Sequence, residues 1–199
     1  MIVLGVDPGT VATGFGVVAQ SGSRFACLEE GDVRAPARRP MPERLNIIHA
    51  KIVELIAHHR PDAVAVEDAF ISKQKSPQTA VKLGQARGVI LLACAQAGVP
   101  VTDYTPNVVK QSVCGYGRAD KEQVIYMVQR LLNLPSPPHS EHAADALGHD
   151  RRVFHHPLVL RHKVETGELL AVGRPVQRGH LRPGERRLLP GSGSELDYL

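Results

Sequence analysis

Four side chains of the kind that bind metals stand at positions where folding would bring them together. Asp7 follows one apolar, β-branched run, and Glu67 follows a second. The carboxyl ends of parallel strands share one edge of an open α/β sheet, where such sheets place their chemistry, so both acids are expected at that edge. His142 and Asp145 are three residues apart and therefore share one face of a helix.

Three carboxylates gathered without a base would repel one another, and a divalent cation relieves that repulsion. Hard oxygen ligands that leave room for water and phosphate suit Mg²⁺ or Mn²⁺. Two such ions about 4 Å apart activate water on one side of a phosphodiester and stabilise the leaving oxygen on the other. Taken singly, Asp7 is also explained as a turn cap, Glu67 as a strand end, and His142 and Asp145 as surface side chains. Their joint occurrence instead predicts a site for metal ions.

The elements that must position these residues are visible as apolar runs and apolar periodicity. Strands are expected over residues 2–6, 14–19, 24–31, 63–67 and 99–104, and helices over residues 42–59, 78–96, 106–113, 120–132 and 140–154. This order predicts an α/β fold: a mixed five-stranded sheet of three antiparallel strands plus two parallel strands, with helices on both faces. A right-handed crossover lays the fourth strand parallel to the first, which sets Asp7 beside Glu67.

The chain is expected to form one domain over residues 1–154, followed by a flexible tail over residues 155–199, where Pro, Gly and Arg are scattered without a sustained period. No stretch approaches the roughly 18 apolar residues of a membrane span, and no signal peptide is apparent. The three cysteines are widely spaced and form no CxxC pair, which indicates a reducing cytoplasm rather than a disulfide framework or a zinc site.

The charge is mildly basic and unevenly spread. The sequence has 24 Lys and Arg against 20 Asp and Glu, a formal net charge of +4. Between residues 71 and 121, seven bases stand against two acids, which is compatible with a polyanionic partner. Aromatic residues make up only 4% of the chain, which argues against a surface that stacks many single-stranded bases.

Several motifs together resemble the RuvC family of Holliday-junction resolvases, members of the ribonuclease-H-like nuclease superfamily. The matching stretches are residues 4–10 (LGVDPGT), 13–16 (TGFG), 82–88 (KLGQARG), 104–106 (YTP) and 142–147 (HAADAL), with further single positions between them. The resemblance covers residues 1–153. It implies a ribonuclease-H-like fold for the domain predicted above.

The resemblance places the family's acidic site on Asp7, Glu67 and Asp145, with His142 at the fourth position, where many relatives carry an aspartate. A neutral histidine removes one negative charge and offers a softer nitrogen ligand. We therefore expect weaker binding of Mg²⁺ relative to Mn²⁺ than an aspartate at residue 142 would give.

The activity implied by the resemblance is symmetric, divalent-metal-dependent cleavage of two opposed strands of a four-way DNA junction in recombination and repair. The family acts as a homodimer, which suits the approximate two-fold symmetry of the junction. The resemblance also implies a bacterial, cytoplasmic protein that receives junctions from the branch-migration complex RuvA–RuvB.

DNA contacts are expected around the site. Phe70 would act as a wedge at a distorted base step; the alternative is a ring tucked against the sheet edge. Lys73 and Lys75 would hold phosphates as mobile point charges. Lys110 and Lys121 match family lysines near the active site, whereas Arg87 and Arg118 are weaker candidates. Any of these bases is otherwise a solvated surface charge.

The predicted helix over residues 78–96 carries small residues at Ala80, Gly84 and Gly88, spaced four apart. Such a stripe lets another backbone come close, either across a dimer or against the protein's own sheet.

Two other functions share parts of this pattern. Sugar-kinase and Hsp70/actin-like ATPases also begin with a strand, an aspartate and a glycine-threonine turn, but they need two such domains around a nucleotide, and no second copy of the turn is present in this sequence. A junction-binding protein without catalytic activity is the other alternative, and retention of all four ligand positions argues against it.

Overall fold

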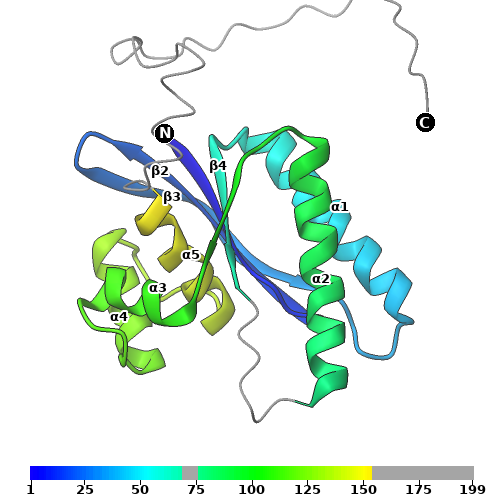
Figure 1. Ribbon diagram of the computed structural model, residues 1–199. Helices are drawn as coiled ribbons and strands as arrows, with labels where there is room; N and C mark the ends of the chain where they lie inside the picture. The colour runs from blue at the N-terminus through cyan, green and yellow to red at the C-terminus, as the bar shows by residue number, and fades with distance from the viewer. Residues whose placement is uncertain (69–75, 154–199) are drawn as a thin grey trace, which may run out of the picture.

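The structure is a computed structural model that describes residues 1–68 and 76–153 (Figure 1). The described residues form five strands: β1 (Ile2–Asp7), β2 (Ala12–Ser21), β3 (Arg24–Arg34), β4 (Ala63–Glu67) and β5 (Val101–Tyr104). They also form five helices: α1 (Met41–His59), α2 (Pro77–Gln96), α3 (Pro106–Cys114), α4 (Lys121–Leu131) and α5 (Glu141–Val153). The tail predicted over residues 155–199 lies outside the described residues.

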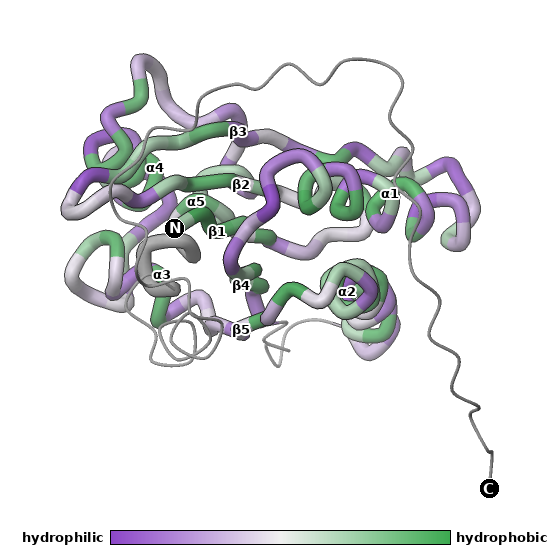
Figure 2. Tube along the Cα trace, turned by 90° about the horizontal axis from the view of Figure 1, so that it is seen from above, coloured by the Kyte–Doolittle hydropathy of each residue, from purple (hydrophilic) through white to green (hydrophobic). Residues whose placement is uncertain are grey.

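The strands form one mixed sheet in the order β3-β2-β1-β4-β5, which is visible from above in Figure 2. β2 is antiparallel to both β1 and β3. β4 runs parallel to β1 and to β5. The predicted sheet of three antiparallel and two parallel strands is therefore confirmed. Val6 pairs with Val66, so the residues that follow them, Asp7 and Glu67, end two neighbouring parallel strands on the same side of the sheet.

Helices cover both faces of the sheet, as the sequence predicts (Figure 1). One face carries α1 and α2 around a core that includes Leu4, Ile48 and Ile90. The other face carries α3, α4 and α5 around a core that includes Val3 and Val109. Neighbouring residues of β1 thus serve opposite cores, because side chains alternate along a strand. None of the helices within the described ranges is long and apolar enough to cross a membrane.

Several strand boundaries differ from the sequence prediction; β2, for example, extends two residues past the predicted range at each end. β3 continues to Arg34, three residues past the predicted end at Gly31, because its pairing with β2 runs on as far as Ala12. A glycine favours a turn, but this one lies inside the strand and faces the ring of Phe15. β5 is two residues shorter than predicted and begins at Val101.

Two glycines of β2 let α5 lie directly on the sheet. A Cβ on Gly14 would overlap the backbone carbonyl of His142, and a Cβ on Gly16 would stand 2.6 Å from the Leu147 side chain. Neither glycine has a positive φ, so the strand needs them for space rather than for backbone conformation. Buried alanines of the helix complete the close contact: Ala143, Ala144 and Ala146.

We expect Gly14→Ala to lower the free energy of unfolding by about 1–3 kcal/mol, because the added methyl group must push two backbones apart. Urea denaturation of the natural protein and the variant measures this change. Amide hydrogen exchange should show the loss of protection concentrated in α5.

Gly31→Ala is the matched control, since it also adds a methyl group to a strand glycine. Its new Cβ would meet only the edge of the Phe15 ring, at 3.3 Å, and a side chain shifts more readily than a backbone. Equal destabilisation by the two substitutions would contradict the assigned role of Gly14.

Candidate metal centre

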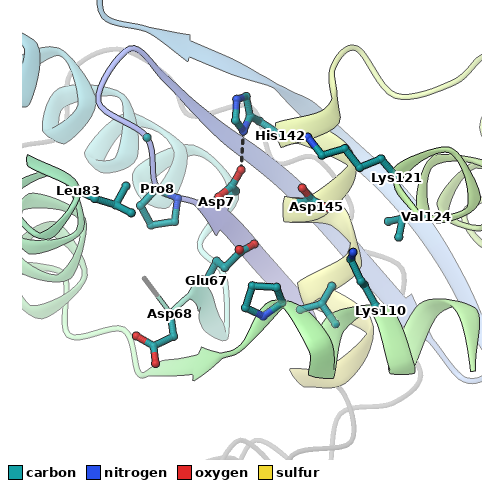
Figure 3. Close-up of a pocket in the computed structure, with 13 residues that line it drawn as sticks. Asp7, Pro8, Glu67, Asp68, Leu83, Lys110, Lys121, Val124, His142 and Asp145 are labelled. Carbon is teal, nitrogen blue, oxygen red and sulfur yellow. Dashed lines mark hydrogen bonds and ion pairs between the residues drawn. The ribbon is translucent and has the colours of Figure 1, made fainter. Parts of the chain in front are cut away.

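The sheet edge and α5 bring three carboxylates together. Asp7 ends β1, Glu67 ends β4, and Asp145 lies in the first half of α5. One carboxylate oxygen from each residue lies within 4.8 Å of the other two, and all three residues are half-buried. Figure 3 shows the three side chains lining one pocket. The structure thus unites the three acids that the sequence spaces far apart.

His142, the fourth residue of the predicted set, joins the group through Asp7. Its Nδ1 lies 2.6 Å from Oδ2 of Asp7 (Figure 3). This hydrogen bond is the main cause that raises the pKa of the imidazole; burial opposes the shift, and the negative charges of Asp7, Asp32 and Asp145 add to it. Because the pKa is raised, the contact stabilises the fold fully below about pH 6.5, and its contribution is lost as the pH rises through the raised value.

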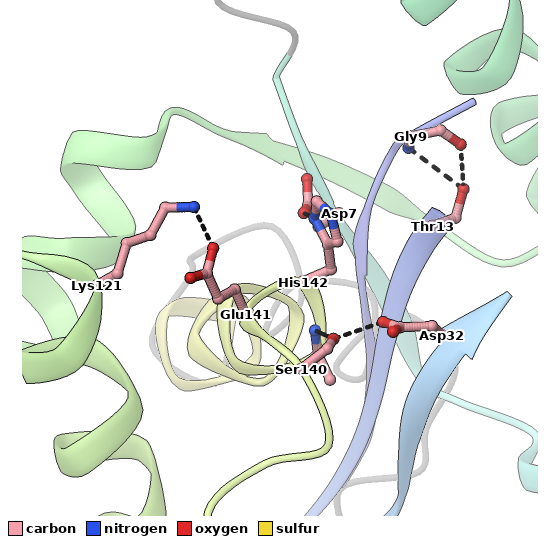
Figure 4. Close-up of polar contacts among 9 residues, drawn as sticks. Asp7, Gly9, Thr13, Asp32, Lys121, Ser140, Glu141 and His142 are labelled. Carbon is pink, nitrogen blue, oxygen red and sulfur yellow. Dashed lines mark hydrogen bonds and ion pairs between the residues drawn. The ribbon is translucent and has the colours of Figure 1, made fainter. Parts of the chain in front are cut away.

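The turn that follows Asp7 is held by side-chain hydrogen bonds. The Thr13 hydroxyl donates to the carbonyl of Gly9 at 2.6 Å and accepts from the N–H of the same residue at 3.2 Å (Figure 4). The buried guanidinium of Arg44, from α1, donates through Nε to the Thr10 carbonyl at 2.8 Å. These bonds satisfy backbone groups that the turn leaves without strand partners. They fix the backbone that carries the first carboxylate.

Two lysines line the same pocket, which has a volume of about 470 Å³. Lys110 comes from α3, and Lys121 is the first residue of α4. The ammonium of Lys121 forms an ion pair with Glu141 of α5 (Figure 4), and this contact raises the pKa of Lys121. Lys110 forms no ion pair with any residue of the described ranges. The pocket therefore places two lysine ammonium groups near three carboxylates. The ammonium groups suit the binding of a phosphate.

Among the described residues, the other predicted DNA contacts do not line the pocket. Arg87 of α2 forms an ion pair with Asp103 at 2.6 Å, and it is not among the residues that line the pocket. Arg118 is exposed in the turn between α3 and α4. Phe70, Lys73 and Lys75 lie outside the described residues. The roles of these five residues as DNA contacts stay predictions.

Sequence reasoning missed some residues that shape the site. Glu141 gave no signal, because nothing in its spacing identifies Lys121 as its partner. The acid Asp68, beside Glu67, also lines the pocket. Gly14 did carry a usable signal: glycines that alternate along a strand indicate the close approach of another backbone.

Comparison with known proteins agrees with this geometry. A model of the family RuvC, crossover junction endodeoxyribonuclease RuvC, matches residues 3–149. A crossover junction endodeoxyribonuclease RuvC from Pelotomaculum thermopropionicum is 50% identical over 147 residues, which is 74% of this chain and 88% of that protein. A relative of the same name from Alkalilimnicola ehrlichii is 49% identical over 145 residues, 73% of this chain and 86% of that protein.

Solved structures give the same result. Thermus thermophilus RuvC is 38% identical and superposes with a TM-score of 0.68, covering 84% of this chain and 97% of that one. The T. thermophilus RuvC structure in complex with a Holliday junction substrate superposes with a TM-score of 0.70 at the same identity, covering 84% of this chain and 96% of that one. The chain therefore belongs to the RuvC family of crossover junction endodeoxyribonucleases.

Proposed function

We propose that this endonuclease resolves Holliday junctions by symmetric, divalent-metal-dependent hydrolysis of phosphodiesters in two opposed strands, in DNA recombination and repair. The most direct support is the convergence of Asp7, Glu67 and Asp145 within 4.8 Å, in a pocket that Lys110 and Lys121 also line. The T. thermophilus relative, whose structure was solved with a Holliday junction substrate, supports the choice of DNA. Family membership favours this function over the ATPase alternative.

The residues of the site fit divalent cations. All three acids offer carboxylate oxygens, the hard ligands that Mg²⁺ and Mn²⁺ take. Three like charges at this separation and partial burial are disfavoured without positive charge between them. We infer that Asp7, Glu67 and Asp145 hold two ions of Mg²⁺ or Mn²⁺, with His142 as a fourth ligand.

When bound, the ions activate the attacking water and neutralise charge on the leaving oxygen. The carboxylates fix the place where the phosphodiester lies, because each is carried by a rigid strand end or helix. Lys110 and Lys121 stabilise the charge of the phosphate oxygens. Glu141 and a bound phosphate would share or compete for the three N–H donors of the Lys121 ammonium. The remaining contacts, which give affinity rather than sequence information, come from Lys73, Lys75, Arg87 and Arg118, with Phe70 as the wedge.

The exposed side of α2 supports the proposal of a homodimer. Gly84 and Gly88 are exposed, and a Cβ on either would meet nothing within 4 Å, so the alternative that this stripe packs on its own sheet is wrong. Val81 and Leu92 extend the same stripe and are 63% and 50% exposed. A stripe of apolar and small residues left uncovered on a helix is typical of a subunit contact. We propose that two copies of α2 meet there.

We also propose a domain boundary, a cellular location and a protein partner. The nuclease domain occupies residues 1–154, which is supported by the family match over residues 3–149. A cytoplasmic location and a hand-over from RuvA–RuvB are supported by membership of a family with bacterial relatives.

We expect Asp7→Asn to reduce the rate of junction cleavage by at least 10³-fold, because a shared metal ligand loses its charge. Binding of a labelled four-way junction without metal should change little, since the phosphate contacts remain. Gel-shift and cleavage assays on the same preparations measure both.

Asp68→Asn is the control, because this acid lines the pocket but lies outside the three-carboxylate group. Cleavage by Asp7→Asn at the natural rate would reject the metal site. Equal loss of binding and cleavage would instead indicate a general loss of DNA contact.

His142→Asp should shift metal preference from Mn²⁺ toward Mg²⁺, because it adds a negative charge and a harder ligand. The substitution should also remove the competition between a metal ion and a proton for the imidazole of His142. In the natural protein, the metal concentration for half-maximal cleavage should rise about tenfold for each pH unit below the raised pKa of His142.

Titrations of both metals at several pH values, on the natural protein and the variant, test this expectation. An identical ratio of Mg²⁺ to Mn²⁺ requirement in the two proteins would contradict the ligand role of His142.

Leu92→Arg should weaken the dimer at least tenfold, because it buries a charge at the proposed contact. Sedimentation over a concentration series measures the change. Val53→Arg places the same charge on α1, at a residue that is 41% exposed, and should leave the association unchanged. Equal behaviour of the two variants would place the dimer contact elsewhere.

A further inference from the structure

A row of three paired residues crosses the sheet beneath the first turn of α5. Asp7 of β1 pairs with Gly14 of β2, which pairs in turn with Asp32 of β3. Paired residues of antiparallel strands point to the same face of the sheet. Gly14 provides the space for the backbone of His142. An aspartate therefore stands on either side of the point where the helix rests.

Both aspartates bond to the beginning of the helix. On one side, Nδ1 of His142 lies 2.6 Å from Asp7. On the other side, the hydroxyl of Ser140 donates to Oδ1 of Asp32, also at 2.6 Å (Figure 4). The same hydroxyl accepts from the N–H of Ala143 at 3.0 Å, so Ser140 caps the helix. Asp32 thus bonds to the side chain that caps the helix.

A second acid of β3 reinforces this anchor. Glu30 pairs with Gly16, the other glycine beneath α5. Its carboxylate accepts from the backbone N–H of His139, at 3.0 Å and 3.1 Å. Residues two apart on a strand share a face, so Glu30 and Asp32 approach the helix together. Glu30 and Asp32 thus accept hydrogen bonds from His139 and Ser140, the two residues that precede the helix.

We propose that Asp32, acting through Ser140, is a positioning residue for the metal site: it fixes the start of α5 so that His142 and Asp145 meet Asp7. This inference rests on the metal site proposed above. Without Asp32, the Ser140 cap would lose its partner on β3, and the side-chain contacts left at the start of the helix would be those of His139 with Glu30, Glu141 with Lys121, and His142 with Asp7. Partners that orient metal ligands typically change metal affinity by 10- to 100-fold when they are removed.

Asp32→Ala removes the acceptor of the Ser140 hydroxyl, whereas Asp32→Asn keeps an oxygen that accepts it. In the metal-free protein, hydrogen exchange of the Ala143 and Ala144 amides should be about tenfold faster in Asp32→Ala and near the natural rate in Asp32→Asn. The Mn²⁺ concentration for half-maximal junction cleavage should follow the same order, with a rise of about tenfold in Asp32→Ala.

Ser140→Ala provides a second route to the same loss and serves if Asp32→Ala does not fold. The two substitutions break one contact, so their effects on the Mn²⁺ requirement should not add in the double variant. Asp62→Ala is the matched control: Asp62 also holds a backbone group, the N–H of Ile2 at 2.5 Å, but at the opposite end of β1. It should lower thermal stability without changing the Mn²⁺ requirement.

The proposal would be overturned if Asp32→Ala left α5 exchange and the Mn²⁺ requirement unchanged. It would equally be overturned if Asp62→Ala raised that requirement as much, or if Asp32→Asn behaved like Asp32→Ala. Cleavage that survives Asp7→Asn would instead reject the metal site. The exchange data would then still report whether Asp32 anchors the helix.

Discussion

Repulsion among three carboxylates is the constraint on which this structure depends. Asp7, Glu67 and Asp145 present oxygens within 4.8 Å of one another, at a partly buried place where like charges interact strongly. Only a rigid scaffold holds such a group ready for cations. Two parallel strands fix the first two acids in register, and cores on both faces of the sheet keep those strands in place.

The third acid depends on how α5 is seated. The glycines of β2 let the helix touch the sheet, and hydrogen bonds on both sides of Gly14 determine where its first turn lies. The same helix carries Glu141, which forms an ion pair with Lys121, a residue that also lines the pocket. One helix therefore carries Asp145, His142 and the ion-pair partner of Lys121. The position of α5 on the sheet thus links the fold to the candidate metal site.

Much of this architecture could be predicted from the sequence, because it follows from local patterns. Apolar runs gave the strands, and the acids at the ends of two runs gave two of the three site carboxylates; the spacing of His142 and Asp145 gave a shared helical face. Asp32 was missed because Gly31 looks like the end of a strand, whereas pairing with β2 carries β3 past it. Contacts such as Ser140–Asp32 join residues 108 positions apart, and no local pattern encodes their partners.

Diffraction from crystals of this protein grown with Mn²⁺, recorded at the manganese absorption edge, would show whether Asp7, Glu67 and Asp145 bind divalent ions. Anomalous peaks should lie between the carboxylates of Asp7, Glu67 and Asp145, and they should disappear in crystals of Asp7→Asn. Manganese bound elsewhere while these three carboxylates remain without an ion at saturating concentration would contradict the account.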